Sequence, residues 1–195
     1  IDLVEEALGM TPGRDHLFEV FIQIHAKNKL NGTLTGPDGK AVEFRQIDPV
    51  NNEDGGAPGG NIRVGFLFNP GKVAFDDRAG GGPTSATTIN PDGSLGQNPG
   101  RVDPSNPAWN PAPPLAGEVF GFDGARKPLT AEFMVDGQRL ILVLNHFKSK
   151  SQDQPLFGRF QQPDQFTLDQ RKAQAQVVAD FVRDLLAADP AARIV

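Results

Sequence analysis

The residues best suited to chemistry stand where the most hydrophobic stretch of the chain ends. That stretch, RLILVLNHFKSK, covers residues 139–150, and its apolar run stops at Asn145 and His146, with Lys148 and Lys150 close behind. An imidazole exchanges protons near neutral pH and ammonium groups attract anions, so this combination suits work on a negatively charged group. The structural alternative is a histidine at the edge of the core, bonded to a carbonyl and followed by two solvated lysines.

The composition excludes several classes of chemistry. The chain has 195 residues with 19 Lys+Arg against 24 Asp+Glu, and its formal charge of -5 gives no general attraction to nucleic acid. Any phosphate binding must therefore be local or assisted by a metal. The absence of cysteine rules out disulfides, thiolate metal sites and a cysteine nucleophile. His16 and His25 have no metal-binding spacing, and no apolar stretch approaches the roughly 20 residues of a membrane span, so no membrane partner is expected.

A β-hairpin is expected to position His146. The segments LTAEFMV and QRLILVLNHF flank Asp136-Gly137, a dipeptide typical of a tight hairpin turn. Two antiparallel strands are therefore predicted, the second of which ends at the histidine.

One long helix is predicted over residues 167–190. Thr167 and Gln170 have the spacing of a capping box, and Asp189-Pro190 ends the helical pattern. An apolar stripe at helical spacing is expected to pack on a sheet; its members are Val178, Phe181, Val182 and Leu185. The final RIV predicts the next strand, which gives a layered domain with mixed pairing.

The remainder of the chain predicts short strands and long loops. LFEVFIQIH at 17–25 alternates with period two and begins a predicted antiparallel meander. Residues 48–61 contain too much Gly, Asn and Pro for regular structure, whereas NIRVGFLFN at 61–69 predicts a buried strand. Residues 79–115 predict a long Gly/Pro-rich loop, either functional or poorly ordered, in which Trp109 is interpreted as an anchor packed on the domain.

Three stretches, in this order along the chain, resemble a known superfamily. NNEDGGAPGGNIRVGFLFNPGKV, RKPLTAEFMVDGQRLILVLNHFKSK and QRKAQAQVVADFV together resemble predicted extracellular bacterial members of the endonuclease/exonuclease/phosphatase superfamily, whose fold is DNase I-like. The resemblance covers about residues 43–195, and residues 1–42 do not match. It implies a metal-dependent phosphodiesterase or phosphatase built on a four-layer α/β sandwich.

The resemblance implies a catalytic role at the end of the strand. His146 matches the catalytic histidine, which acts as general acid or base or, when protonated, stabilises charge on the phosphoryl oxygens. Asn145 is expected to orient it. Lys148 and Lys150 alternate with their neighbours in strand geometry and can meet flanking phosphates if the extended conformation continues.

Two arginines are implied as substrate-binding residues by the same resemblance. Arg126 matches an arginine that contacts the nucleic-acid backbone, and its cationic fork suits phosphate oxygens. Arg171, with Gln174 after it, stands where several members place a phosphate-contacting arginine. The alternatives stay open: Arg126 as a loop residue, and Arg171 as a solvent-facing residue of the first helical turn.

The expected metal is Mg²⁺ or Mn²⁺, which the superfamily holds with a glutamate from an early strand. Glu6 in IDLVEE loosely resembles that glutamate, but its spacing to the next strand differs. The Gly-Asp-x-Asn strand and the Asp-His pair that follow later in the family are not in this sequence. Because Mg²⁺ needs oxygen ligands with at least one carboxylate, the chain alone is expected to be nearly inactive unless another chain supplies them.

These observations predict a single, incomplete α/β (α+β) domain over residues 1–195, a partial DNase I-like sandwich with mixed, largely antiparallel sheets. The predicted function is a metal-dependent phosphoester hydrolase, above all a nuclease, acting on nucleic acid or another phosphoester. The alternative is a non-catalytic fragment or remodelled relative without the metal site, which acts by self-association through exposed strand edges or with a partner chain. The resemblance alone implies an extracellular location.

Overall fold

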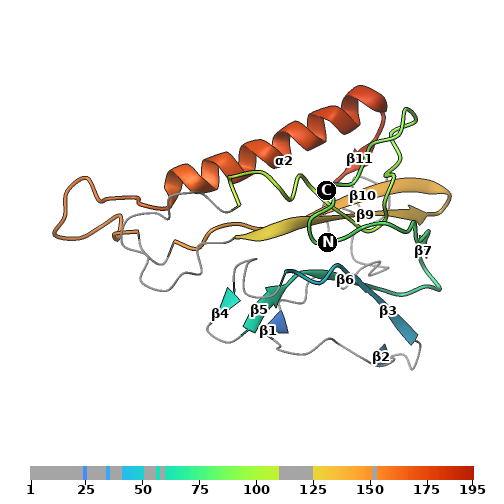
Figure 1. Cartoon of the computed structure of the whole chain (residues 1–195), viewed down its shortest axis with the longest axis horizontal. Helices are drawn as coiled ribbons and strands as arrows, with labels where there is room; N and C mark the ends of the chain where they lie inside the picture. Colours follow the sequence, from blue (N-terminus) through green and yellow to red (C-terminus); the bar gives the residue numbers. More distant parts are fainter. Residues whose placement is uncertain are drawn as a thin grey trace.

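The computed structural model of the chain describes residues 24–25, 34–35, 41–50, 56–57, 60–109, 125–150 and 153–195. Three layers are visible in Figure 1: the helix α2 lies on one side of the long strands β9 and β10, and the strands around β3 and β6 lie on the other side. Among the strands in these described ranges, β10 and β11 pair parallel and the other pairs are antiparallel. This architecture confirms the predicted mixed α/β or α+β class.

The central hairpin forms as predicted. The strands β9 (Arg126–Val135) and β10 (Gln138–His146) pair antiparallel, with Val135 opposite Gln138. Both turn residues between them have positive φ angles, 49° at Asp136 and 75° at Gly137. Such a turn matches the right-handed twist of the strands, which explains why this dipeptide closes the hairpin.

The predicted helix and the strand after it are also confirmed. Helix α2 (Leu168–Ala188) ends at Asp189, and β11 (Arg193–Ile194) then pairs parallel to β10, with Ile194 opposite Ile141. The predicted capping box is wrong, because Thr167 makes no side-chain cap hydrogen bond and its hydroxyl donates instead to Asp153. A long-range carboxylate therefore replaces the local cap.

The alternation of side chains along β10 divides the core between the two faces of the sheet. Leu140 and Leu142 belong to the cluster shared with β6 (Gly65–Phe68), whereas Ile141 packs with Leu185 of α2. The cluster beside β6 contains four phenylalanines whose ring centroids lie 5.1 to 5.6 Å apart, Phe66, Phe68, Phe75 and Phe133. Edge-to-face and tilted rings at these distances add attraction beyond the buried area.

The outer strands form two small antiparallel sheets. One has the order β2 (Leu34–Thr35), β3 (Ala41–Gln46), β6, and the other has the order β1 (Ile24–His25), β5 (Gly60–Arg63), β4 (Gly56–Ala57). The predicted strand at 61–69 is divided at Val64 into β5 and β6, and β4 is a short strand inside the segment predicted as irregular. Of the strand predicted at 17–25, only its last two residues are described.

The Gly/Pro-rich loop, as far as residue 109, is fastened to the edge of β9. Strand β8 (Gly100–Arg101), inside the loop, pairs with β9 opposite Leu129, and β7 (Ala74–Phe75), just before the loop, pairs with β9 opposite Phe133. Trp109 is completely buried and its indole N–H donates to the carbonyl of Asp103 at 2.8 Å, so the predicted anchor role is confirmed. The loop thereby extends the sheet and satisfies an edge that would otherwise expose backbone groups.

Candidate functional site

Arg126 and His146 meet where β9 begins and β10 ends. Nη2 of Arg126 lies 2.6 Å from Nε2 of His146, and the two residues are cross-strand partners. Between this pair and the pair Leu129 and Leu144, β9 has one more residue than β10. Because side chains alternate along a strand, the extra residue turns Arg126 onto the same face as His146. The bulge therefore creates the contact.

The contact fixes the proton on the imidazole. A guanidinium only donates hydrogen bonds, so Nε2 of His146 must accept, and the ring is neutral with its proton on Nδ1. Burial lowers the pKa of Arg126, because removing the cation from water disfavours its charge. No partner reaches its Nε among the residues that the structure describes. Binding of an anion would offset the free-energy cost of burying this cation.

The residues next to His146 point to different partners. Asn145 is exposed, and its side-chain amide donates to the carbonyl of Val143 at 3.0 Å, within its own strand. Its expected role in orienting the imidazole stays a prediction. Strand β10 ends at His146, so the two lysines follow it outside the ladder, and their predicted contact with flanking phosphates stays a prediction. Lys148 is half-buried and its backbone N–H donates to Gln174, whereas Lys150 is exposed.

Arg171 is committed to a carboxylate. Its guanidinium donates to Asp153 at 2.9 Å and also bonds the hydroxyl of Thr167. Asp153 additionally accepts from the N–H and hydroxyl of Thr167 at 2.8 and 2.9 Å. Although burial opposes it, these bonds with Thr167 and Arg171 lower the pKa of Asp153. In this structure Arg171 fastens the start of α2, and its predicted phosphate contact stays a prediction.

Two buried glutamines join the helix to the site. Gln170 and Gln174 lie on the buried stripe of α2, four residues apart, and both donate to the carbonyl of Ala108, at 3.3 and 3.0 Å. Gln174 also accepts from the N–H of Lys148 at 2.9 Å, so it couples the end of β10 to the buried loop. The sequence places Gln170 at helical spacing from Phe181, on the stripe expected to be buried, and this spacing could have identified it. No local pattern identifies Asp153 as the partner of Arg171, because the two residues lie 18 positions apart.

The described part of the site suits an anion. Arg126 supplies a cation beside the imidazole of His146, Lys148 follows two residues later, and the carboxylate of Asp153 is held by Arg171. Within the ranges that the structure describes, no group of three or more His, Asp or Glu side chains is placed to share a metal ion. Glu6 lies outside those ranges. The residues described here therefore do not fit Mg²⁺ or Mn²⁺ by themselves.

Two open depressions follow α2 on the side of the buried loop. The larger, of about 850 Å³, lies between α2 and residues 86–91, and the smaller, of about 460 Å³, lies beside Pro107. Neither is lined by His146 or Arg126. The pair of Arg126 and His146 thus stands at the rim of the sheet, apart from both depressions.

Comparison of the chain with family models, with curated proteins and with solved structures finds no match. Among the described helices, none combines the length and apolar character that crossing a bilayer requires.

Proposed function

We propose that this chain is a phosphoester hydrolase of the DNase I-like type whose substrate is nucleic acid, with His146 and Arg126 holding the phosphoryl group. The observation that carries the proposal is the 2.6 Å contact between these two residues at the rim of the central sheet. Dependence on Mg²⁺ or Mn²⁺, the DNase I-like fold and an extracellular location come from the resemblance and belong to the proposal.

A phosphodiester inserted between the two side chains gives both of them a better partner. Arg126 can present two N–H groups to phosphoryl oxygens in place of the single bond to the imidazole. His146, no longer an acceptor for Arg126, can take a proton on Nε2 and donate it as a hydrogen bond to another phosphoryl oxygen. Two cations this close repel each other without the anion, so proton and phosphate bind together.

The position at the strand ends suits catalysis. The packed hairpin holds the backbone of both residues, and the buried carboxamide of Gln174 fixes the chain just after His146. Once the phosphodiester has separated the two side chains, donors carried on a fixed backbone need little further reorganisation as charge develops on the phosphoryl oxygens. His146 can then exchange a proton with the attacking water or the leaving oxygen.

Relaxation of supercoiled plasmid DNA in the presence of Mg²⁺ or Mn²⁺ tests the proposal. His146→Ala is expected to lower the rate by about 10²-fold or more, the usual scale for losing an acid–base group. Arg183→Ala is the matched control for the preparation, because this exposed arginine pairs with Asp180 on α2 and lies in neither strand of the site. Equal rates for the wild type and His146→Ala would remove the histidine from the mechanism.

The non-catalytic alternative is favoured by one observation. The carboxylate of Asp153 is bound by Arg171 and Thr167 and is not open to a metal. Titration with Mn²⁺, followed by electron paramagnetic resonance, separates the two readings. If the chain is a metal-dependent hydrolase, it binds Mn²⁺ stoichiometrically, and Glu6→Gln or the replacement of another ligand carboxylate abolishes this binding. If the chain is a non-catalytic fragment, it binds no Mn²⁺.

A further inference from the structure

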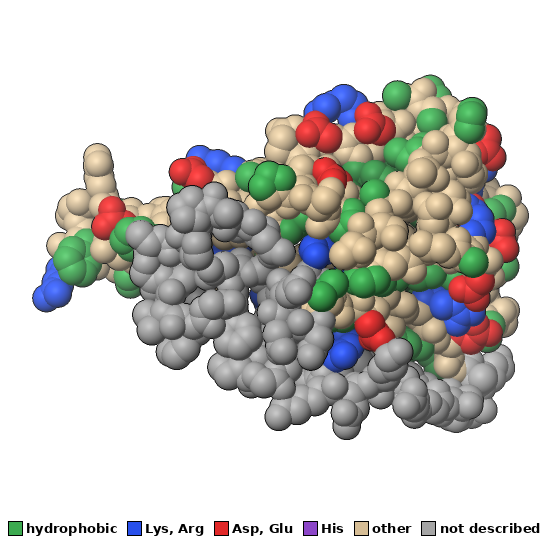
Figure 2. Space-filling view, in the orientation of Figure 1, with side chains coloured by type: hydrophobic (Ala, Val, Ile, Leu, Met, Phe, Trp, Pro, Cys, Tyr) green, Lys and Arg blue, Asp and Glu red, His purple; other side chains and the backbone are tan. Residues whose placement is uncertain are grey.

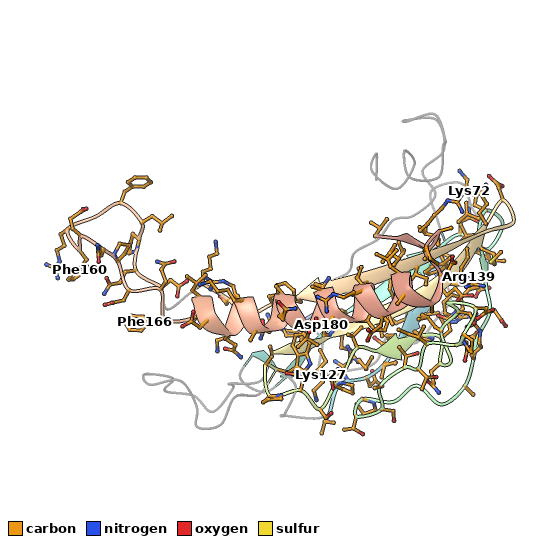
Figure 3. The ribbon with its side chains drawn as sticks, turned by 90° about the horizontal axis from the view of Figure 1, so that it is seen from above. Lys72, Lys127, Arg139, Phe160, Phe166 and Asp180 are labelled. Atoms are coloured by element: carbon orange, nitrogen blue, oxygen red, sulfur yellow. The ribbon has the colours of Figure 1, made fainter. Side chains whose placement is uncertain are left out.

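A loop with exposed aromatic rings projects from the body of the protein between β10 and α2. Figure 1 shows it in orange beyond the first turn of α2, and Figure 3 labels Phe160 near its far end and Phe166 where the helix begins. We refer to residues 155–163 as the aromatic finger. It follows the end of β10, so it lies at the same end of the sheet as Arg126 and His146.

Hydrogen bonds close the base of the aromatic finger. The backbone N–H of Gln154 donates to the carbonyl of Asp164 at 3.0 Å, and the N–H of Asp164 donates to the side-chain oxygen of Gln154 at 3.0 Å. The amide of Gln165 donates back to the carbonyl of Gln154 at 3.1 Å. Together with the bonds of Asp153 to Thr167, they hold the two legs of the loop together, so the finger has a fixed root beside α2.

The rings of the aromatic finger are unusually exposed. Phe157 is 93% exposed, Leu156 67% and Phe160 48%, and Phe166 at the base is 52% exposed. Exposed single apolar residues are common, but a contiguous group of them marks an interaction site. Figure 2 shows hydrophobic, basic and acidic side chains side by side on the projecting part, away from the main body.

The charge of the aromatic finger is opposite to that of the whole chain. Its nine residues contain Arg159 and no carboxylate, while the chain has a formal charge of -5. The guanidinium carbon of Arg159 lies 4.7 Å from the centroid of the Phe160 ring, which makes one stacked, cationic surface. Lys148 and Lys150 lie on the segment that leads from His146 to the finger. Cations interleaved with aromatic rings suit an unpaired nucleic-acid strand.

We propose that the aromatic finger binds single-stranded nucleic acid by stacking bases on Phe157 and Phe160 while Arg159 meets a phosphate. The inference rests on the proposed function and specifies that the part of the substrate bound by the finger has unpaired bases, such as a supercoiled plasmid exposes locally, since stacked bases inside a duplex offer no free face. A base bound on the finger continues the path of the strand towards the phosphate held by Arg126 and His146. The flat rings and the stacked guanidinium favour this ligand over a lipid surface, for which the finger offers only one cation.

Fluorescence anisotropy with a short labelled single-stranded DNA oligonucleotide tests the inference. EDTA in the buffer prevents hydrolysis, so the measurement reports binding alone. The double variant Phe157→Ala/Phe160→Ala is expected to weaken binding by about tenfold or more, because each stacked base loses its partner. Phe157→Trp/Phe160→Trp is expected to restore it. Both variants change exposed side chains, so the wild-type melting temperature is expected in each.

The controls separate stacking from other causes. Leu186→Ala removes an exposed apolar side chain from α2, 41% exposed, and is expected to leave affinity unchanged. An oligonucleotide of equal length with abasic sites keeps the phosphates but no bases, and it should bind the wild type as weakly as it binds the double alanine variant. Equal binding of normal and abasic strands by the wild type overturns the inference, as does a double alanine variant that binds like the wild type.

The same variants distinguish the finger from the catalytic proposal. If the double alanine variant loses oligonucleotide binding while wild type and His146→Ala hydrolyse plasmid DNA equally, the finger stands and the catalytic assignment fails. If His146 proves essential and the double variant binds normally, the finger fails and the hydrolase stands. Loss of binding to phosphatidylcholine vesicles in the double variant, with oligonucleotide binding intact, would assign the finger to lipid and overturn the inference.

Discussion

Asn98 and Glu132 are joined by two hydrogen bonds that replace a rung of a β-ladder. The side-chain amide of Asn98 donates to the carbonyl of Glu132 at 2.9 Å, and its oxygen accepts from the N–H of Glu132 at 2.8 Å. The rung lies between the parts of β9 that pair with β7 and β8. A side chain from the Gly/Pro-rich loop thus completes the central sheet at the point where neither short strand reaches it.

Asn98→Ala is expected to lower the free energy of unfolding by about 2–4 kcal/mol, because it leaves buried backbone groups of Glu132 without partners. Urea denaturation followed by fluorescence of Trp109 measures the change. The matched control is Asn90→Ala, since the amide of Asn90 makes one part-buried bond to Ser94, and a loss of no more than about 1 kcal/mol is expected. Equal losses in both variants would refute the structural role of Asn98.

Arg126→Ala is expected to weaken oligonucleotide binding without lowering the melting temperature. Burial lowers the pKa of Arg126, which means that the folded protein holds this cation at a cost, so its removal should leave the melting temperature unchanged or higher. Affinity for a single-stranded oligonucleotide should nevertheless fall about tenfold, because a phosphate loses its fork of donors. Arg183→Ala removes the same charge from an exposed position on α2 and serves as the control. A fall in stability with intact affinity would show a purely structural role.

Oligonucleotide binding is expected to be coupled to proton uptake at His146. The ring is neutral while Nε2 accepts from Arg126, and a phosphate between the two residues turns Nε2 into a donor. Calorimetry in two buffers with different ionisation enthalpies counts the protons, and phosphodiesters themselves do not titrate near neutral pH. Affinity should therefore rise as pH falls through the range in which free imidazole becomes protonated. Proton uptake that persists in His146→Gln would locate the titrating group elsewhere.

Asp153→Asn is expected to loosen the junction between the projecting loop and α2. Burial opposes ionisation, but the bonds from Thr167 and Arg171 lower the pKa of Asp153 below its ordinary value. A carboxylate with a lowered folded-state pKa stabilises the protein above about pH 4 and loses that contribution as pH falls through the folded value. The melting temperature of the variant should be about 2–4 °C lower at pH 7 and should converge with the wild type in acid.

The control for this junction is Asp180→Asn. Bonds from Gln176 and Arg183 lower the pKa of Asp180, but this ion pair lies on the exposed face of α2. Its replacement is expected to change the melting temperature little at either pH, because exposed ion pairs contribute little to stability. A difference for Asp153→Asn that does not depend on pH would exclude the carboxylate as its cause.

The sequence by itself determined the elements whose patterns are local. Asp136-Gly137 tolerates the positive φ angles that a tight turn requires, so this dipeptide closes the hairpin between β9 and β10. A run of residues at helical spacing, ended by Asp189-Pro190, forms α2. The position of His146 at the end of a hydrophobic strand followed from the same local pattern. Each of these depends on neighbouring residues in the chain, so the sequence contains the whole signal.

Only the tertiary structure decided which side chains meet. The extra residue in β9 turns Arg126 towards His146. The pattern of apolar and polar residues in one strand does not reveal this bulge, because a bulge is defined by how two strands pair. The hydroxyl of Thr167 donates to Asp153, 14 residues away in the chain, in place of the predicted capping box. Bonds between residues far apart in the chain depend on packing, which no single segment encodes.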